Sequence, residues 1–276
     1  MGASPPSRAW GVRLRFTTVL AFLFSLVVQV GFPLGAALHF RRRTLVHWTP
    51  FFMGALVYAL FQLFTWLPLS TYLDAAVGAG IASEARAFVW LLAMAFTGSL
   101  LEEVGRLWGY RALFSRTDEG LSWQNGVMFG LGHGAVESML LIAGLTFVYL
   151  LAYMALNLLG PDAIIASVSS DGSPAFHEAL QNIIEATWVQ PAVVAFERVV
   201  GVVHQVAWAL LVMQSLVSRQ KRWFGLSVLY HASVAVIVPG LARLFGFSVA
   251  EAANAALAVL SLWIIISLRA AVATQH

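Results

Sequence analysis

The sequence predicts an all-α fold, a polytopic bundle of about seven transmembrane helices. Of its 276 residues, 60% are hydrophobic and only 11% are charged, and the mean hydropathy is +0.81. A soluble domain of this length would need a far more polar surface. The net charge of +3 is small, and the basic residues gather at the ends of apolar runs. That distribution indicates membrane topology and not nucleic-acid binding.

Each expected transmembrane segment is an apolar run of about 20 residues or more, the length that a bilayer core requires. The runs are 16–40, 50–70, 87–112, 123–152, 191–218, 223–243 and 249–272. Their connections alternate in charge, and basic connections favour the cytoplasmic side. Basic residues follow the first, third and fifth runs, whereas the connection 159–190 has acidic residues and no Lys or Arg. We therefore expect the N-terminus outside and the C-terminus in the cytoplasm, although three arginines before the first run oppose this orientation.

The chain is expected to form a single domain over 1–276, because it shows no internal repeat. The first run is too long for a cleaved signal peptide. The connection 159–190 contains Ser173 and Pro174 as a helix start, followed by apolar residues at helical spacing up to Trp188. We expect an interfacial amphipathic helix there, which either packs on the bundle or gates a substrate path. The absence of cysteine excludes disulfides, thiolate metal sites and a cysteine nucleophile.

Charged residues inside the expected transmembrane segments are the main functional signal. The six are Glu102, Glu103, Arg106, Glu137, Glu197 and Arg198, and the same segments hold His133, His204 and His231. A charge at the middle of a membrane helix costs roughly 2.5–3.5 kcal/mol, so such residues are functional candidates by default. Counted from the cytoplasmic ends, Glu103 and the three histidines lie at similar depths of roughly 12–21 Å. We therefore expect four helices to bring titratable groups together.

Local spacing favours pairs within this set. Glu102 and Glu103 precede Arg106 by four and three residues, so either can pair with its guanidinium. His133 and Glu137 are four residues apart, a spacing that suits two ligands of one metal or a histidine–carboxylate relay. A structural reading competes with both, because an Arg–Glu pair can serve only to neutralise itself.

Several motifs in the same order resemble the YhfC family of membrane peptidases. They are Glu-Glu-x-Gly-Arg at 102–106, FGLGHG at 129–134, a Glu-Arg pair before His204, LYH at 229–231, and GALVYALFQLFTWLPL at 54–69. The resemblance covers about 50–240. That family is grouped with the type II CAAX prenyl endopeptidases and the PrsW-like proteases, and is related to a non-catalytic subunit of γ-secretase. The resemblance implies a multi-pass protein of a prokaryotic plasma membrane.

The resemblance also implies a site in which a glutamate activates water and an arginine supports the second glutamate. Histidines from other helices bind metal or stabilise the oxyanion. Two departures matter. Arg106 comes one residue sooner than in the CAAX pattern, so which glutamate is the base stays open. The asparagine that follows a late histidine in that pattern is replaced here by Ala235 after His231 and by Trp208 after His204.

We therefore expect an intramembrane peptidase that acts on a membrane-associated peptide or protein, in contact with membrane lipid and without nucleic acid. A divalent metal, zinc by its donors, would be held by His133, His204 and His231, with Glu137 as a further ligand. Glu102 or Glu103 would be the general base, and Arg106 would orient its partner.

Arg198 is expected to neutralise the neighbouring Glu197. Three other functions remain open at this point. They are a non-catalytic membrane scaffold of the same fold, an ion- or proton-coupled transporter, and a haem protein with two facing histidines. A scaffold should tolerate Glu→Gln changes in the glutamate pair, whereas a peptidase should not.

Overall fold

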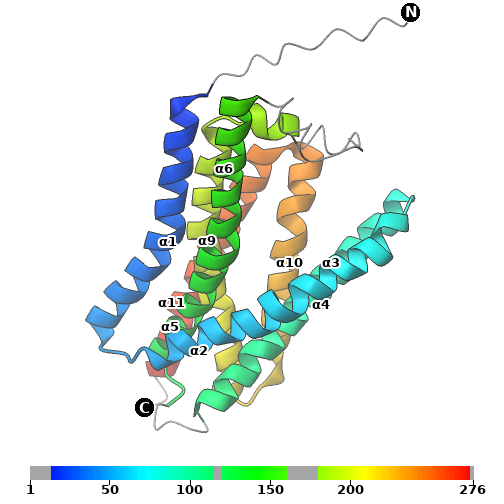
Figure 1. Ribbon diagram of the computed structural model, residues 1–276. Coiled ribbons are helices and arrows are strands. Elements are labelled where there is room, and N and C mark those ends of the chain that lie inside the picture. Colours follow the sequence, from blue (N-terminus) through cyan, green and yellow to red (C-terminus); the bar gives the residue numbers. More distant parts are fainter. Residues whose placement is uncertain (1–13, 115–119, 161–179, 274–276) are drawn as a thin grey trace, which may run out of the picture.

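The computed structural model describes residues 14–114, 120–160 and 180–273, and within these ranges the chain is helical and has no strand (Figure 1). Seven helical runs are long and apolar enough to cross a membrane, which confirms the predicted multi-pass bundle. They are Phe16–Thr44, Thr49–Gly80, Glu84–Ala112, Trp123–Leu159, Val189–Val217, Lys221–Phe245 and Phe247–Arg269. The direction in which the termini face the membrane stays a prediction, as does the single domain.

The elements follow one another with few breaks. They are α1 (Phe16–Thr44), α2 (Thr49–Tyr58), η1 (Ala59–Trp66), α3 (Leu67–Ala76), η2 (Gly78–Gly80), α4 (Glu84–Phe114), α5 (Trp123–Val136), η3 (Glu137–Ile142), α6 (Ala143–Leu159), α9 (Val189–Val217), α10 (Lys221–Phe245) and α11 (Phe247–Ala273). The predicted interfacial helix lies partly outside the described residues, as do Ser173 and Pro174. Its described part is helical at 180–184.

Helix α9 is the centre of the bundle. It packs against α1, α4, α5, α10 and α11. Of its most apolar window, 72% is buried inside the protein, against at most 28% for any other candidate span. Lipid can cover an apolar helix, but the polar side chains of α9 need partners on neighbouring helices. This position explains why polar side chains on α9 contact residues of several other helices.

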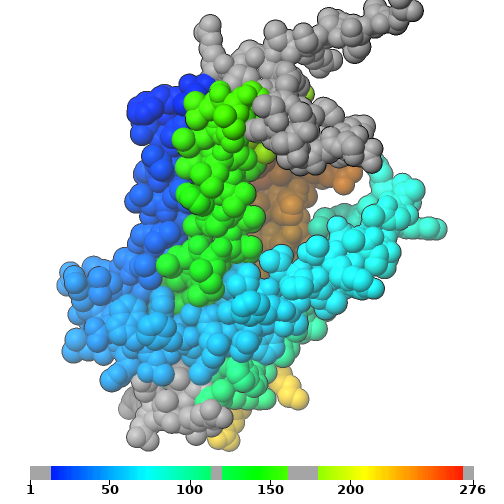
Figure 2. Space-filling model, viewed as in Figure 1, coloured from blue at the N-terminus to red at the C-terminus, as the bar shows by residue number. Residues whose placement is uncertain are grey.

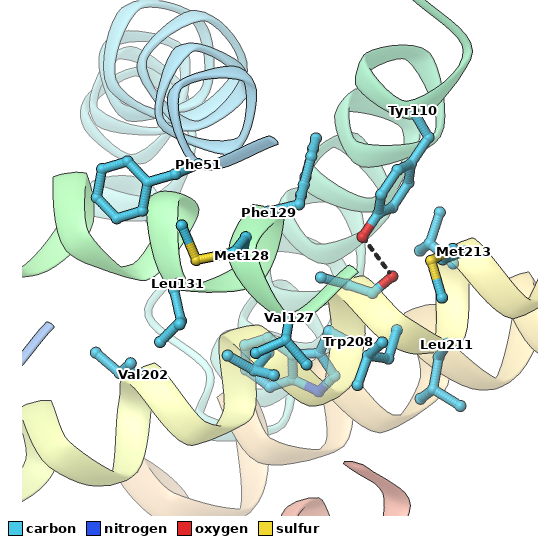
Figure 3. Close-up of a cluster of buried hydrophobic side chains, with 14 of the residues drawn as sticks. Phe51, Tyr110, Val127, Met128, Phe129, Leu131, Val202, Trp208, Leu211 and Met213 are labelled. Carbon is cyan, nitrogen blue, oxygen red and sulfur yellow. Dashed lines mark hydrogen bonds between the residues drawn. The ribbon is translucent and has the colours of Figure 1, made fainter. Parts of the chain in front are cut away.

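Glycines allow α5 to lie very close to α2. A Cβ at Gly132 would press on the backbone carbonyl of Phe51, and a Cβ at Gly54 would press on that of Phe129. Figure 3 shows Phe51 and Phe129 in the apolar cluster at this contact, beside Tyr110 of α4. The ring of Tyr110 stacks on Phe129 with centroids 4.3 Å apart, and its hydroxyl donates to the carbonyl of Ala209 at 3.0 Å.

Two transmembrane runs contain a π-helical segment, η1 in the second and η3 in the fourth. Such segments rotate the side chains that follow them and are frequent at functional sites. Here η1 carries Gln62 and η3 begins at Glu137. Beyond η1, α3 and the first part of α4 lean away from the bundle, and Figure 2 shows a hollow between α3 and α10.

Candidate functional site

The site is built on α4, where both glutamates of the sequence motif are buried beside an arginine. Glu102 is 4% exposed, and Glu103 and Arg106 are fully buried. Arg106 forms ion pairs with both, through Nη2 to Glu102 and through Nη1 to Glu103. Unpaired charges would be very costly at this depth, so one guanidinium serves two carboxylates. The spacing of three and four residues along the helix permits both contacts.

Both carboxylate oxygens of Glu103 are bonded to protein groups. The hydroxyl of Ser227 on α10 donates to its Oε2 at 3.0 Å. Its Oε1 accepts from Arg106 and lies 2.9 Å from Nδ1 of His231. These partners hold Glu103 in one position and leave it outside the lining of the adjacent cavity.

Glu102 faces that cavity. His133 of α5 approaches it, with Nε2 2.9 Å from Oε1, and Gln62 of η1 donates to Oε2. Nε2 of His231 lies 4.0 Å from Oε2. Partners on η1, α4, α5 and α10 therefore hold Glu102, and it still lines the cavity on one side.

The cavity lies among the helices that carry these residues and has a volume of about 340 Å³. Polar side chains make up most of its lining, which consists of Tyr58, Gln62, Glu102, Glu137, Glu197, Arg198, Gly201, His204, Gln205, Trp208, His231, Val234, Val238 and Asn254. Such a space can hold water and a polar segment of a substrate, which the surrounding lipid cannot.

A second polar layer continues from Arg106 across α9. The side-chain amide of Gln205 accepts from Arg106 through its oxygen and donates to Glu137 Oε2 at 2.7 Å. Glu137 also accepts from Nη1 of Arg198 at 3.0 Å. Arg198 thus pairs with Glu137, not with its neighbour Glu197 as expected from sequence, because adjacent helical residues point about 100° apart.

His204 lies on the far side of Trp208 along α9 from the glutamate pair. Its Nδ1 is 2.8 Å from the hydroxyl of Ser261, and its Nε2 is 3.3 Å from Oδ1 of Asn254. Trp208 stacks on both imidazoles, with ring centroids 5.5 Å from His204 and 3.8 Å from His231. His204 therefore borders the cavity but is bonded to α11 instead of the glutamates.

The expected metal ligands do not form one group. His133 and His231 meet at Glu102, whereas His204 is bonded to α11 and Glu137 to Arg198 and Gln205. In the part of the chain that the structure describes, no three histidine, aspartate or glutamate side chains are arranged to hold a metal ion. This arrangement does not fit a zinc site with three histidine ligands and an open position.

Several site residues were not singled out from the sequence, namely Gln62, Gln205, Ser227 and Asn254. Each is an uncharged polar residue inside an apolar helix, and each contacts a charged or histidine side chain of the site. Amide and hydroxyl groups in lipid-spanning helices require hydrogen-bond partners. Their presence inside apolar runs was the sequence signal that could have indicated these four residues.

A comparison of the sequence with protein families identifies a matching family. The sequence model described as YhfC intramembrane metalloprotease matches residues 25–257, which is most of the chain. That description implies a divalent metal. The chain matches no curated protein and no solved structure.

Proposed function

The chain belongs to the YhfC intramembrane metalloprotease family, and on this premise we propose that it hydrolyses a peptide bond of a membrane-associated substrate. The observation that carries the proposal is the position of Glu102. Its carboxylate lies at a polar cavity inside the bundle, with two imidazoles and a guanidinium around it. A charged group in a lipid-spanning helix is expensive and is a functional candidate by default, and this one lines a polar pocket.

In the proposed reaction, Glu102 acts as general base. A water molecule in the cavity gives a proton to Glu102 as its oxygen bonds to the carbonyl carbon of the substrate. The protonated Glu102 then delivers that proton to the amide nitrogen as the carbon–nitrogen bond breaks. Water is consumed, and a carboxylic acid and an amine are formed. His133, at 2.9 Å, and Gln62 hold the carboxylate in place.

Glu103 and Arg106 are positioning residues in this proposal. Glu103 is enclosed by Arg106, Ser227 and His231 and does not line the cavity, so it is not the base. It orients His231 and shares the guanidinium that neutralises Glu102. Glu137, Arg198 and Gln205 extend the same network and keep Arg106 aligned. Glu197 lines the cavity and is not assigned a step.

The family's description implies a divalent metal, and among such ions a histidine-rich set of donors favours zinc. A catalytic zinc needs three protein ligands and a water. Here only His133 and His231 face the glutamate pair, and Arg106 already supplies a cation beside the same oxygens. Because the residues do not fit, no step of the reaction is derived through a metal.

The proposal is tested with the purified chain in proteoliposomes and a library of fluorescence-quenched peptides that carry an apolar anchor. We expect hydrolysis by the wild type and a loss of about 10²–10⁴-fold in kcat for Glu102→Gln, the range typical of a general base. Glu84→Gln is the matched control, because Glu84 lies on the same helix and is exposed. Equal rates for wild type and Glu102→Gln would overturn the proposal and favour a non-catalytic scaffold.

A further inference from the structure

Asn254 of α11 is a buried polar residue with no part in the reaction described so far. It is 7% exposed and borders the same cavity as Glu102 and His231. An asparagine in a lipid-spanning helix needs partners for both ends of its amide. The two ends of this amide have different surroundings.

The oxygen of the Asn254 amide is held by His204. Nε2 of His204 lies 3.3 Å from Oδ1, and since a carbonyl oxygen only accepts, the imidazole donates. His204 is itself fixed, because its Nδ1 lies 2.8 Å from the hydroxyl of Ser261. Ser261 is in turn 2.8 Å from the hydroxyl of Tyr230, whose single proton goes either to Ser261 or to the carbonyl of Leu257, 2.7 Å away. The orientation of Asn254 therefore rests on a chain of hydrogen bonds between α9, α10 and α11.

The nitrogen of the Asn254 amide is the free end. Among the described residues, none accepts a hydrogen bond from Nδ2. This nitrogen is not among the buried polar atoms that lack a partner, and Asn254 lines the cavity. Its two N–H groups are available to a molecule in the cavity.

Hydrolysis of a peptide bond requires a donor of this kind. When water attacks, the carbonyl oxygen becomes negative, and a fixed donor that meets it lowers the barrier. The other amide donors at the cavity are committed, Gln62 to Glu102 and Gln205 to Glu137. Arg106 is fully buried and bonded to three side chains.

We propose that Asn254 is a catalytic residue whose Nδ2 donates a hydrogen bond to the carbonyl oxygen of the substrate. This inference rests on the proposed peptidase function. As water bonds to the carbonyl carbon, the π electron pair of the C=O bond moves onto oxygen, where Asn254 stabilises it. The pair returns when the carbon–nitrogen bond breaks. Asn254 transfers no proton, and His204, Ser261 and Tyr230 are positioning residues for its amide.

The test compares two variants of Asn254 in the proteoliposome assay with the quenched peptide that the wild type cleaves fastest. Asn254→Leu removes the donor with little change in volume, and Asn254→Asp keeps the shape but replaces the donor with an oxygen. We expect kcat to fall by about 10²–10³-fold in both, with KM changed by less than about threefold. Ser261→Ala, which frees the His204 ring, should lower kcat by a smaller factor.

Asn157→Leu is the control, because Asn157 is a partly buried asparagine on α6 that bonds the carbonyl of Tyr153 and does not line the cavity. It should leave kcat unchanged. If either Asn254 variant keeps its thermal midpoint and a kcat within about threefold of the wild type, Asn254 is structural only and the inference is wrong. If Asn254→Leu does not fold, the isosteric Asn254→Asp decides. Hydrolysis that Glu102→Gln abolishes but neither Asn254 variant affects overturns this inference alone, whereas a wild type without hydrolysis overturns both proposals.

Discussion

The indole of Trp208 stacks on the imidazole of His231, with ring centroids 3.8 Å apart and planes inclined by 14°. This contact fixes the plane of the ring that joins the two glutamates, since Nδ1 of His231 is 2.9 Å from Glu103 and Nε2 is 4.0 Å from Glu102. The guanidinium of Arg106 lies 5.8 Å from the same indole. The indole of Trp208 therefore packs against the charged cluster and restricts the position of His231. The sequence indicated Trp208 only as the residue that replaces an asparagine of the CAAX pattern.

We expect Trp208→Leu to lower kcat by about 10–100-fold, because a misplaced catalytic group costs rate even when it is still present. Trp208→Phe keeps a flat ring and should recover most of the loss. Steady-state kinetics in proteoliposomes measure both. A Trp208→Leu variant as active as Trp208→Phe would show that the stacking does not position His231.

Gln205 offers a test of the network that connects the cluster to Glu137. Gln205→Leu leaves one N–H of the fully buried Arg106 without its partner, and an unsatisfied buried group costs about 1–3 kcal/mol. It also removes the donor to Glu137, which borders the cavity. We expect a lower thermal midpoint and a lower kcat. Nanoscale fluorimetry and the peptide assay measure the two effects.

The control for Gln205 is Gln214 on the same helix, which is also buried but whose Oε1 has no partner within the described residues. Gln214→Leu should be neutral or stabilising, since it removes an unsatisfied polar atom. Equal destabilisation by the two changes would mean that the hydrogen bonds of Gln205 contribute little.

The fold and part of the site could be predicted because both depend on distance along a helix. Runs of apolar residues gave the seven spans, and a fixed rise per residue placed Glu103, His133 and His231 at comparable depths. The structure joins these three through hydrogen bonds with Glu102 and Arg106. Depth is thus readable from one sequence.

The rotation of each helix about its own axis, which decides where its side chains point, could not be predicted from the sequence. His204 is at a suitable depth but is bonded to Ser261 and Asn254 of α11, since the packing of α9 among several helices decides where each side chain points. The spacing of His133 and Glu137 suits two ligands of one metal or a relay, but in the structure their side chains have different partners. Glu137 begins the π-helical segment η3 and is bonded to Arg198 and Gln205.

Gly132 tests the close contact that brings His133 to the site. In Gly132→Ala the new Cβ would lie 2.6 Å from the carbonyl carbon of Phe51, so α2 and α5 must separate. We expect a loss of stability of about 1–3 kcal/mol or more and weakened activity, because His133 is the next residue along α5. Gly144→Ala is the control: nothing lies within 4 Å of its Cβ, and the change should be neutral or stabilising. A stable, fully active Gly132→Ala variant would contradict the packing described.

Removal of metal ions tests the relation between this site and the family's description. A zinc site would have to recruit a third ligand, but His204 is bonded to Asn254 and Ser261, and Arg106 already occupies the glutamate pair. We therefore expect peptide hydrolysis to persist after treatment with a membrane-permeable chelator, and metal analysis of the active protein to find far less than one ion per chain. If chelation abolishes hydrolysis and zinc alone restores it, this prediction is wrong. In that case we expect the His133→Gln and His231→Gln variants to bind no zinc and the His204→Gln variant to bind it as the wild type does. The reason is that His133 and His231 face Glu102, whereas His204 is bonded to α11.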